Sequence, residues 1–241
     1  MSYLRNEYWP WRVLAILTMA WGLIGSARAA EPVTKDLLPA AQLALHGFMV
    51  RCPDPIPGHP QLQRASFACM VLPRPVVAHA DWDWGDCTSR AVEDWFWIRE
   101  MTGDAAFGQE MERAQQATML WILTPDAGMP CVPGRSRPEQ GVYHYQMWDQ
   151  GRTLRALVHW WQIEEDANRR RDLQQRIEKM TASLRSRAKH GQDPTFGSYA
   201  VYPHDSATGD QPGDEIMCMR GGQLIEPLAV YWAATGEPAI R

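Results

Sequence analysis

Apolar residues recur with the 3.6-residue period of an α-helix in several stretches of the chain, and these stretches are of two kinds. Apolar side chains cover most of the circumference in residues 88–101, 151–164 and 222–234. A single apolar stripe runs along residues 36–49, 104–122 and 167–188. The first kind predicts helices that are buried on several sides, and the second predicts helices with one face in water.

The two kinds of predicted helix follow each other in a regular order. Long irregular loops precede the predicted buried helices, at residues 50–84, 124–146 and 191–219, and short turns precede the one-sided helices 104–122 and 167–188. Tyr199–Tyr202 in the third loop is compatible with a short strand. This order is typical of concentric rings, with inner helices around an axis and outer helices facing solvent. The long loops would then meet at the N-terminal ends of the inner helices, where we expect a functional site.

A recurring sequence pattern marks the first helix of each predicted hairpin. The pair Arg90-Ala-Val-Glu93 and Thr102-Gly-Asp104 matches the pair Gln223-Leu-Ile-Glu226 and Thr235-Gly-Glu237, and a weaker copy starts at Arg152. The starts lie 62 and 71 residues apart, as expected for stacked hairpins with variable loops. We expect each glycine to adopt the left-handed conformation and the following acid to cap the next helix. Three unrelated helix ends that look alike are the alternative interpretation.

The repeated pattern of Gly/Ser-Arg-x-apolar and Thr-Gly-Asp, followed by an amphipathic helix, resembles the six-hairpin (α/α)-toroid glycosidase-like superfamily. That group includes bacterial β-L-arabinofuranosidases, unsaturated glucuronyl hydrolases and sugar epimerases. The resemblance covers residues 80–241 and implies an all-α fold, an (α/α)6-type toroid with long rim loops. A full toroid has twelve helices, and only six are predicted before the opening turn at residues 236–241. We therefore expect an incomplete toroid, truncated at the C-terminus, with a complete short solenoid as the alternative.

The N-terminal segment has the pattern of an export signal. Arg5 and Arg12 precede an apolar run at residues 13–24, and Ala27-Arg-Ala29 provides small residues for cleavage. A run of about a dozen residues is short for a membrane span, which needs about 20. We expect residues 1–29 to be a signal peptide and residues 30–241 to be a catalytic-like domain that is periplasmic or extracellular. An uncleaved signal anchor is the alternative.

Charge and composition narrow the class of partner. Removal of residues 1–29 takes away three arginines and one glutamate, so the net charge falls from −4 to about −6. Nucleic-acid-binding proteins present a basic face, so we expect no nucleic acid partner. The arginines of residues 167–188 are expected to form a solvated helix face instead. Twelve tryptophans and an apolar fraction of 45% are ample for a packed core.

All five cysteines follow the predicted signal peptide. Cys52 and Cys69 flank a proline-rich loop, and we expect them to form a disulfide worth about 3 kcal/mol in an oxidising compartment. No pair has the CxxC spacing of a metal site, so neither a metal nor a cofactor is predicted. A zinc site assembled from distant cysteines is the alternative.

Each long loop carries acids beside aromatic residues. Carboxylates can bind sugar hydroxyls or transfer protons, and aromatic rings can stack on sugar rings. The predicted catalytic residues are Asp86, Asp149, Asp214 and Glu215. The predicted substrate-binding residues are Trp82, Trp84, Tyr145, Trp148, His144 and Arg152. Structural roles are the alternatives: Asp86 and Asp149 as helix caps, Asp214 and Glu215 in a turn, and the aromatic residues in the core.

The sequence thus predicts an exported carbohydrate-active protein with a carbohydrate substrate, in the first instance a glycoside hydrolase. An inverting glycosidase needs an acid and a base about 6.5–9.5 Å apart, which loops meeting at one rim could supply. A polysaccharide lyase or sugar epimerase would use the same rim. A helical-repeat module that binds a glycan or a protein without catalysis is the other alternative, and it predicts acids engaged in helix caps. Glu93 and Glu226 occupy matching positions, which a repeat explains without catalysis.

Overall fold

The computed structural model describes residues 37–49, 54–65, 67–69, 76–78, 84–195, 197–201 and 218–237. The chain divides into two units, Met1–Leu37 and Leu38–Arg241, and the fold below is that of the second. The predicted signal peptide at residues 1–29 lies outside the described residues.

Helices make up most of the described fold, in agreement with the helical periodicity of the sequence. The α-helices are α2 (Leu38–Leu43), α3 (Trp84–Thr102), α4 (Gln109–Trp121), α5 (Met147–Ile163), α6 (Ala167–Arg187) and α7 (Cys218–Thr235). A π-helical turn, η1 (Ala44–Met49), continues α2, and two short 3₁₀ turns, η2 (Pro133–Arg135) and η3 (Pro138–Gln140), lie between α4 and α5.

Small β-sheets occupy parts of the predicted loops, so the all-α prediction is wrong in this detail. Three two-stranded antiparallel sheets pair β1 (Pro55–Ile56) with β2 (His59–Gln63), β3 (Phe67–Cys69) with β4 (Val76–Ala78), and β5 (Lys189–Asp193) with β6 (Gly197–Val201). The third hairpin begins immediately after α6, and its second strand starts at Gly197, which pairs with Asp193 and has a positive φ of 79°. Strand pairing in a short hairpin gives hydrogen-bond partners to backbone N–H and C=O groups that are not in a helix.

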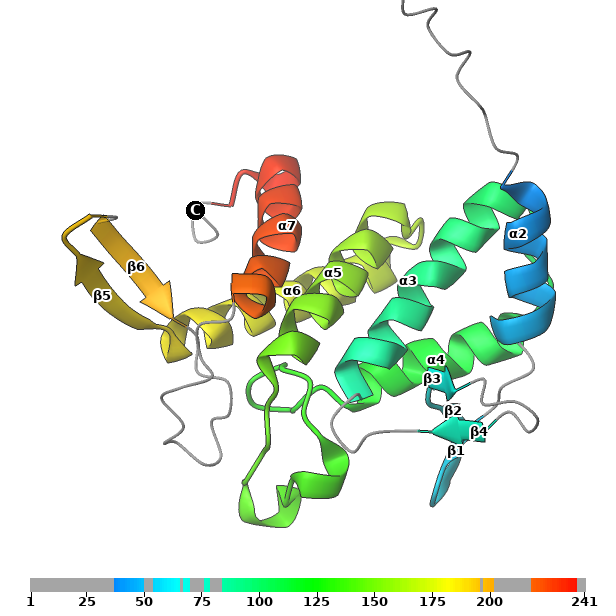
Figure 1. Cartoon of the computed structure of the whole chain (residues 1–241), viewed down its shortest axis with the longest axis horizontal. Helices are drawn as coiled ribbons and strands as arrows, with labels where there is room; N and C mark the ends of the chain where they lie inside the picture. The colour runs from blue at the N-terminus through cyan, green and yellow to red at the C-terminus, as the bar shows by residue number, and fades with distance from the viewer. Residues whose placement is uncertain are drawn as a thin grey trace, which may run out of the picture. The chain divides into compact units, whose positions relative to one another are not determined.

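The helices α3, α5 and α7 run parallel, with α5 in the middle (Figure 1). Ser89 of α3 pairs with Thr153 of α5 near their N-terminal ends, through hydroxyls 2.8 Å apart, and Trp97 meets His159 two turns later. The helices α4 and α6 pack on α3 and α5 as the second helices of two hairpins. The repeat predicts parallel first helices, and two of the three, α3 and α5, are joined to a second helix by a short turn.

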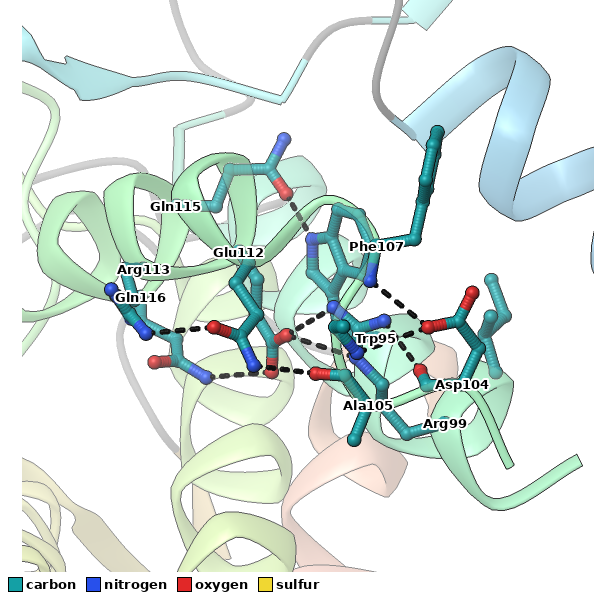
Figure 2. Close-up of polar contacts among 12 residues, drawn as sticks. Trp95, Arg99, Asp104, Ala105, Phe107, Glu112, Arg113, Gln115 and Gln116 are labelled. Atoms are coloured by element: carbon teal, nitrogen blue, oxygen red, sulfur yellow. Dashed lines mark hydrogen bonds and ion pairs between the residues drawn. The ribbon is translucent and has the colours of Figure 1, made fainter. Parts of the chain in front are cut away.

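The turn of the first hairpin is held by a network of polar contacts (Figure 2). Arg99 donates to the Glu112 carboxylate through Nε at 3.1 Å and Nη2 at 2.8 Å, and its Nη1 donates to the Asp104 carbonyl at 2.6 Å. Trp95 Nε1 donates to Gln115 Oε1 at 2.7 Å, which ties α3 to α4 in the interior. Each of these side chains is engaged with the hairpin itself, so the network is structural.

The turn glycines adopt the predicted conformation, whereas the following helix starts later than expected. Gly103 and Gly236 have φ values of 67° and 66°, in the left-handed region. Asp104 Oδ1 accepts the amides of Ala106 and Phe107, but α4 begins only at Gln109. Asp104 therefore holds the turn and is not the cap of α4. By contrast, Asp166 caps α6 as part of the second hairpin, accepting the amides of Asn168 and Arg169.

The two predicted kinds of helix are confirmed for α6 and for α5 up to its last residue, Ile163, which is 48% exposed. In α6 the buried residues lie on one stripe, Leu173, Ile177, Met180 and Leu184. In α5 the apolar residues Leu154, Leu157, Val158 and Trp161 are buried. They join the stripe of α6 in one core cluster that also includes Val92 of α3 and Leu224 of α7.

Helix α7 is buried on one side only, so the prediction of a third enclosed helix is wrong. Leu224 and Tyr231 are buried, whereas Ile225 is 70% exposed and Trp232 is 42% exposed. The matching positions in the other copies, Val92 and Leu154, are fully buried. These two positions lie in helices that have a hairpin partner, and among the described residues α7 has no equivalent of α4 or α6.

Candidate functional site

The N-terminal ends of α3 and α5 approach each other closely enough to require a glycine. A Cβ atom added to Gly85 would lie 2.5 Å from Cβ of Asp149, far inside van der Waals contact. At this point the amide of Asp86 donates to Asp149 Oδ1 at 3.0 Å. Asp149 thus accepts one of the free amides at the start of α3, which explains why α3 begins at Trp84 and not at the predicted residue 88.

The N-terminal ends of α5 and α7 meet in the same manner. A Cβ added to Gly151 would lie 2.6 Å from Cβ of Gln223 and 3.0 Å from its carbonyl carbon. Three helix N-terminal ends therefore lie next to one another, and we refer to this region as the helix-start region. It is the location predicted for the site, and the loop from residue 122 to 146 leads directly into it.

An ionic cluster occupies the helix-start region. Asp86, which is only 3% exposed, accepts a hydrogen bond from Arg90 Nε at 2.8 Å, and Arg152 Nε lies 3.5 Å from the same oxygen. Burial lowers the pKa of the Arg152 guanidinium and the nearby charge of Arg90 lowers it further, while Asp86 opposes both. Two guanidinium groups thus share one carboxylate. Arg152 can therefore also donate hydrogen bonds to a further anionic or hydroxyl group.

Several buried polar atoms near the helix starts have no hydrogen-bond partner among the described residues. They are Thr88 Oγ1, Trp148 Nε1, Arg152 Nε and Gln223 Oε1. A buried polar group without a partner costs about 1–3 kcal/mol, and native proteins carry few of them. A ligand or an ordered water is the usual partner of such groups, so the helix-start region is the candidate site.

Several predicted site residues make contacts within the fold that stabilise it. Tyr145 is buried in the core, where its hydroxyl donates to Thr124 Oγ1 at 3.3 Å. Trp84 is half-buried, with the guanidinium of Arg64 4.0 Å from its ring centroid and the ring of Trp121 6.2 Å away. The backbone amide of His144 donates to Ser136 Oγ at 3.0 Å. Of the predicted residues, Asp86, Asp149, Trp148 and Arg152 are the ones that the helix-start region brings together.

Other predicted residues lie outside the described residues. These are Trp82, Asp214, Glu215 and Cys52. Cys69 belongs to β3, and the predicted Cys52–Cys69 disulfide therefore stays a prediction. Cys87 and Cys131 are buried, and neither forms a disulfide.

A second feature, which we call the shared-face pocket, lies further along the same three helices. It has a volume of about 140 Å³. Its polar and aromatic lining is Glu93, Trp97, Arg155, His159, Gln162 and Glu226. Arg155 donates to Glu93 Oε1 through Nε at 2.8 Å and to Glu226 Oε2 through Nη1 at 2.9 Å. One arginine on the middle helix therefore links both outer ones.

Polar residues at matching positions of the repeat are the sequence signal for this pocket. Glu93, Arg155 and Glu226 stand at the same position in the three copies, and Trp97 and His159 stand four residues later in the first two. A repeat of parallel helices places matching positions on one common face. Polar residues at matching positions thus predict a polar surface running across all three helices.

The described part of the chain has neither a metal-binding cluster nor a membrane-spanning helix. No group of three or more His, Cys, Asp or Glu residues there is arranged to hold a metal ion. None of the helices described is long and apolar enough to cross a membrane.

Comparison with protein-family models, with curated proteins and with solved structures found no match to this chain.

Proposed function

We propose that this chain is an exported carbohydrate-active protein that recognises a glycan at the helix-start region. The observation that carries the proposal is the group of buried polar atoms without partners at the ends of three parallel helices. Sugars present many hydroxyls, and each can both donate and accept a hydrogen bond. A hydroxyl could accept from Trp148 Nε1 or from Arg152, and donate to Gln223 Oε1.

Recognition without hydrolysis is the form of this function that the contacts favour. The carboxylate of Asp149 accepts the amide of Asp86, and the carboxylate of Asp86 pairs with Arg90 and Arg152. Both predicted catalytic acids are thus engaged in holding helices together, as expected for a binding module. An arginine-bound carboxylate can still position a sugar hydroxyl.

Glycoside hydrolysis is the second candidate, and one observation favours it. Asp86 and Asp149 come from different helices but meet at the same end of the fold, as the two acids of a glycosidase must. Hydrolysis would need one of them to donate a proton to the leaving oxygen and the other to activate water or attack the sugar.

The proposal is tested by screening purified protein against a glycan panel for binding and for release of reducing ends. Trp148→Phe removes the indole donor but keeps an aromatic ring, and we expect it to weaken binding about tenfold or more. Trp160→Phe is the matched control, because Trp160 Nε1 donates to Glu164 at the other end of α5. Equal loss in both variants, or a wild-type protein that binds no glycan of the panel, would contradict the proposal.

The two candidate forms are separated by Asp86→Asn and Asp149→Asn. Asparagine Oδ1 can still accept the amide of Asp86, so Asp149→Asn preserves the contact between helices. A hydrolase is expected to lose at least about a hundredfold in turnover in both variants while it retains glycan binding. Asp172→Asn is the control for loss of an aspartate–arginine pair four residues apart, since Asp172 Oδ2 accepts from Arg176 Nε at 2.7 Å. Wild-type turnover in both Asp variants would exclude them as catalytic acids.

A further inference from the structure

The shared-face pocket has more negative than positive charge. Glu93 and Glu226 contribute two carboxylates, and both pair with the single guanidinium of Arg155. His159 adds a positive charge only when it is protonated, and its Nδ1 lies 3.8 Å from Glu93 Oε1. With a neutral imidazole the pocket therefore has a net charge of −1.

The side chains of the pocket are only partly satisfied by one another. Nδ1 of His159 is buried and has no hydrogen-bond partner among the described residues, because 3.8 Å exceeds hydrogen-bond length. The Glu226 side chain is 60% exposed, so its carboxylate remains open to solvent beside the pocket. A ligand with hydrogen-bond donors would find an open acceptor in the Glu226 carboxylate.

An exposed tryptophan forms one wall of the pocket. Trp97 is 45% exposed, although it lies on the most buried of the predicted helices, and its ring centroid lies 4.6 Å from that of His159. The face of an indole ring attracts a cation, and tryptophan is the strongest of the aromatic residues in this respect. Val158, Pro227 and Val230 supply the apolar part of the lining.

The volume of the pocket limits the size of the group that enters it. About 140 Å³ corresponds to about five water molecules at ~30 Å³ each, well below the 300–1,000 Å³ of pockets for drug-sized ligands. The pocket therefore fits one small cationic group and not a whole oligosaccharide.

We propose that the shared-face pocket binds a protonated primary amine, carried by an amino-sugar residue of the glycan that occupies the helix-start region. An ammonium group has three donors, which the two carboxylates can accept, and a positive charge that suits the ring of Trp97. Glu93 follows Asp86 by seven residues, about two helical turns or ~10 Å, so an oligosaccharide could reach both regions. Because the amine is assigned to the glycan bound at the helix-start region, the inference rests on the proposed function.

The test compares a chitosan tetrasaccharide, whose residues carry free amines, with the fully N-acetylated tetrasaccharide, by isothermal titration at pH 7. We expect the chitosan oligosaccharide to bind at least about tenfold more tightly. Glu226→Gln and Trp97→Leu should each remove most of that difference and leave the affinity for the N-acetylated form unchanged. Trp232→Leu is the control, because Trp232 is exposed to a similar extent, 42%, but does not line the pocket.

The outcomes separate this inference from the proposed function. Equal affinity for the two tetrasaccharides, or an amine preference that survives Glu226→Gln and Trp97→Leu, overturns the amine site. Glycan binding that depends on Trp148 but not on the amine leaves the proposed function standing alone. Titration with n-propylammonium tests the amine site without a glycan. If the protein binds this amine, loses that binding in Glu226→Gln and binds no glycan, the amine site is supported and the proposed function is overturned.

Discussion

At the scale of single residues, two glycines and a carboxylate account for the alignment of the central helices. Gly85 and Gly151 permit contacts that a side chain would block, and Asp149 accepts a hydrogen bond from the neighbouring helix start. In the sequence these glycines stand within predicted helices or at their borders, where glycine costs about 1 kcal/mol relative to alanine. Close approach of the neighbouring helix requires glycine at both positions despite that cost.

Replacement of Gly85 by alanine should therefore destabilise the fold, although alanine is the better helix former. The added methyl group overlaps Asp149, and we expect a loss of about 1–3 kcal/mol in the free energy of unfolding. Gly134→Ala is the control, because an added Cβ meets nothing within 4 Å there, and should change stability by less than about 0.5 kcal/mol. Urea unfolding of both variants measures the difference; a neutral Gly85→Ala would show that the helix starts are not in contact.

Glu93 predicts a specific dependence of stability on pH. Burial raises the pKa of Glu93, but His159 and Arg155 together outweigh it and hold the pKa below its ordinary value of 4.5. A carboxyl whose pKa is lowered on folding contributes stability that is fully present above pH 4.5 and is lost as the pH falls through the folded pKa.

Glu93→Gln should remove this contribution. At pH 7 we expect the variant to be less stable by about 1.5–3 kcal/mol, because the charged hydrogen bond to Arg155 is lost. Below pH 4.5 the difference between wild type and variant should shrink. Urea unfolding at several pH values provides the measurement, and a difference that stays constant from pH 7 into the acid range would contradict the role assigned to Glu93.

At the scale of helices, matching positions of the repeat have different surroundings. Leu154 of α5 is fully buried in the main core cluster, whereas Ile225 of α7 holds the same position and is 70% exposed. Leu154→Ala should cost about 2–5 kcal/mol because it leaves a cavity in the core. Ile225→Ala should cost less than about 0.5 kcal/mol. Thermal or urea unfolding checks the pair, and equal losses would mean that Ile225 is covered in solution.

The helices could be predicted from the sequence because periodicity and turn chemistry are local properties. The start of α6 at Ala167 was predicted, since Asp166 caps it through its own neighbours. The predicted start of α3 lies four residues too late, because the Asp86 amide in its first turn donates to Asp149, 63 residues away. The exposure of Ile225 and Trp232 was missed for the same reason: it depends on what packs against α7, which periodicity does not report.

The site was predicted only in part, for related reasons. Parallel helices after long loops predict that Asp86, Asp149, Trp148 and Arg152 lie at one end of the fold, and the structure places them at neighbouring helix starts. Their catalytic and substrate-binding roles stay predictions. Tyr145 was predicted to bind substrate, but it lies in the core, since residue type alone does not distinguish a buried tyrosine from an exposed one. The pairing of Arg155 with two glutamates required the lateral order of three helices, which only the structure provides.

At the scale of the whole molecule, the described helices have two chemically different ends. The N-terminal ends of α3, α5 and α7 carry buried charges and polar atoms without partners, whereas at the opposite end the hairpin turn of Arg99, Asp104 and Glu112 is satisfied by its own contacts. A ligand gains most where groups are left unsatisfied, because it removes a desolvation cost that the fold already carries. The proposed function therefore assigns the glycan to the N-terminal end.

Hydrogen-exchange mass spectrometry of the full chain, with and without the glycan that binds best in the panel, tests this assignment most directly. We predict that the glycan slows exchange in peptides that cover residues 84–90 and 147–153 and leaves the hairpin turns at residues 102–109 and 163–167 unchanged. Protection confined to the hairpin turns, with no change at the helix starts, would contradict it.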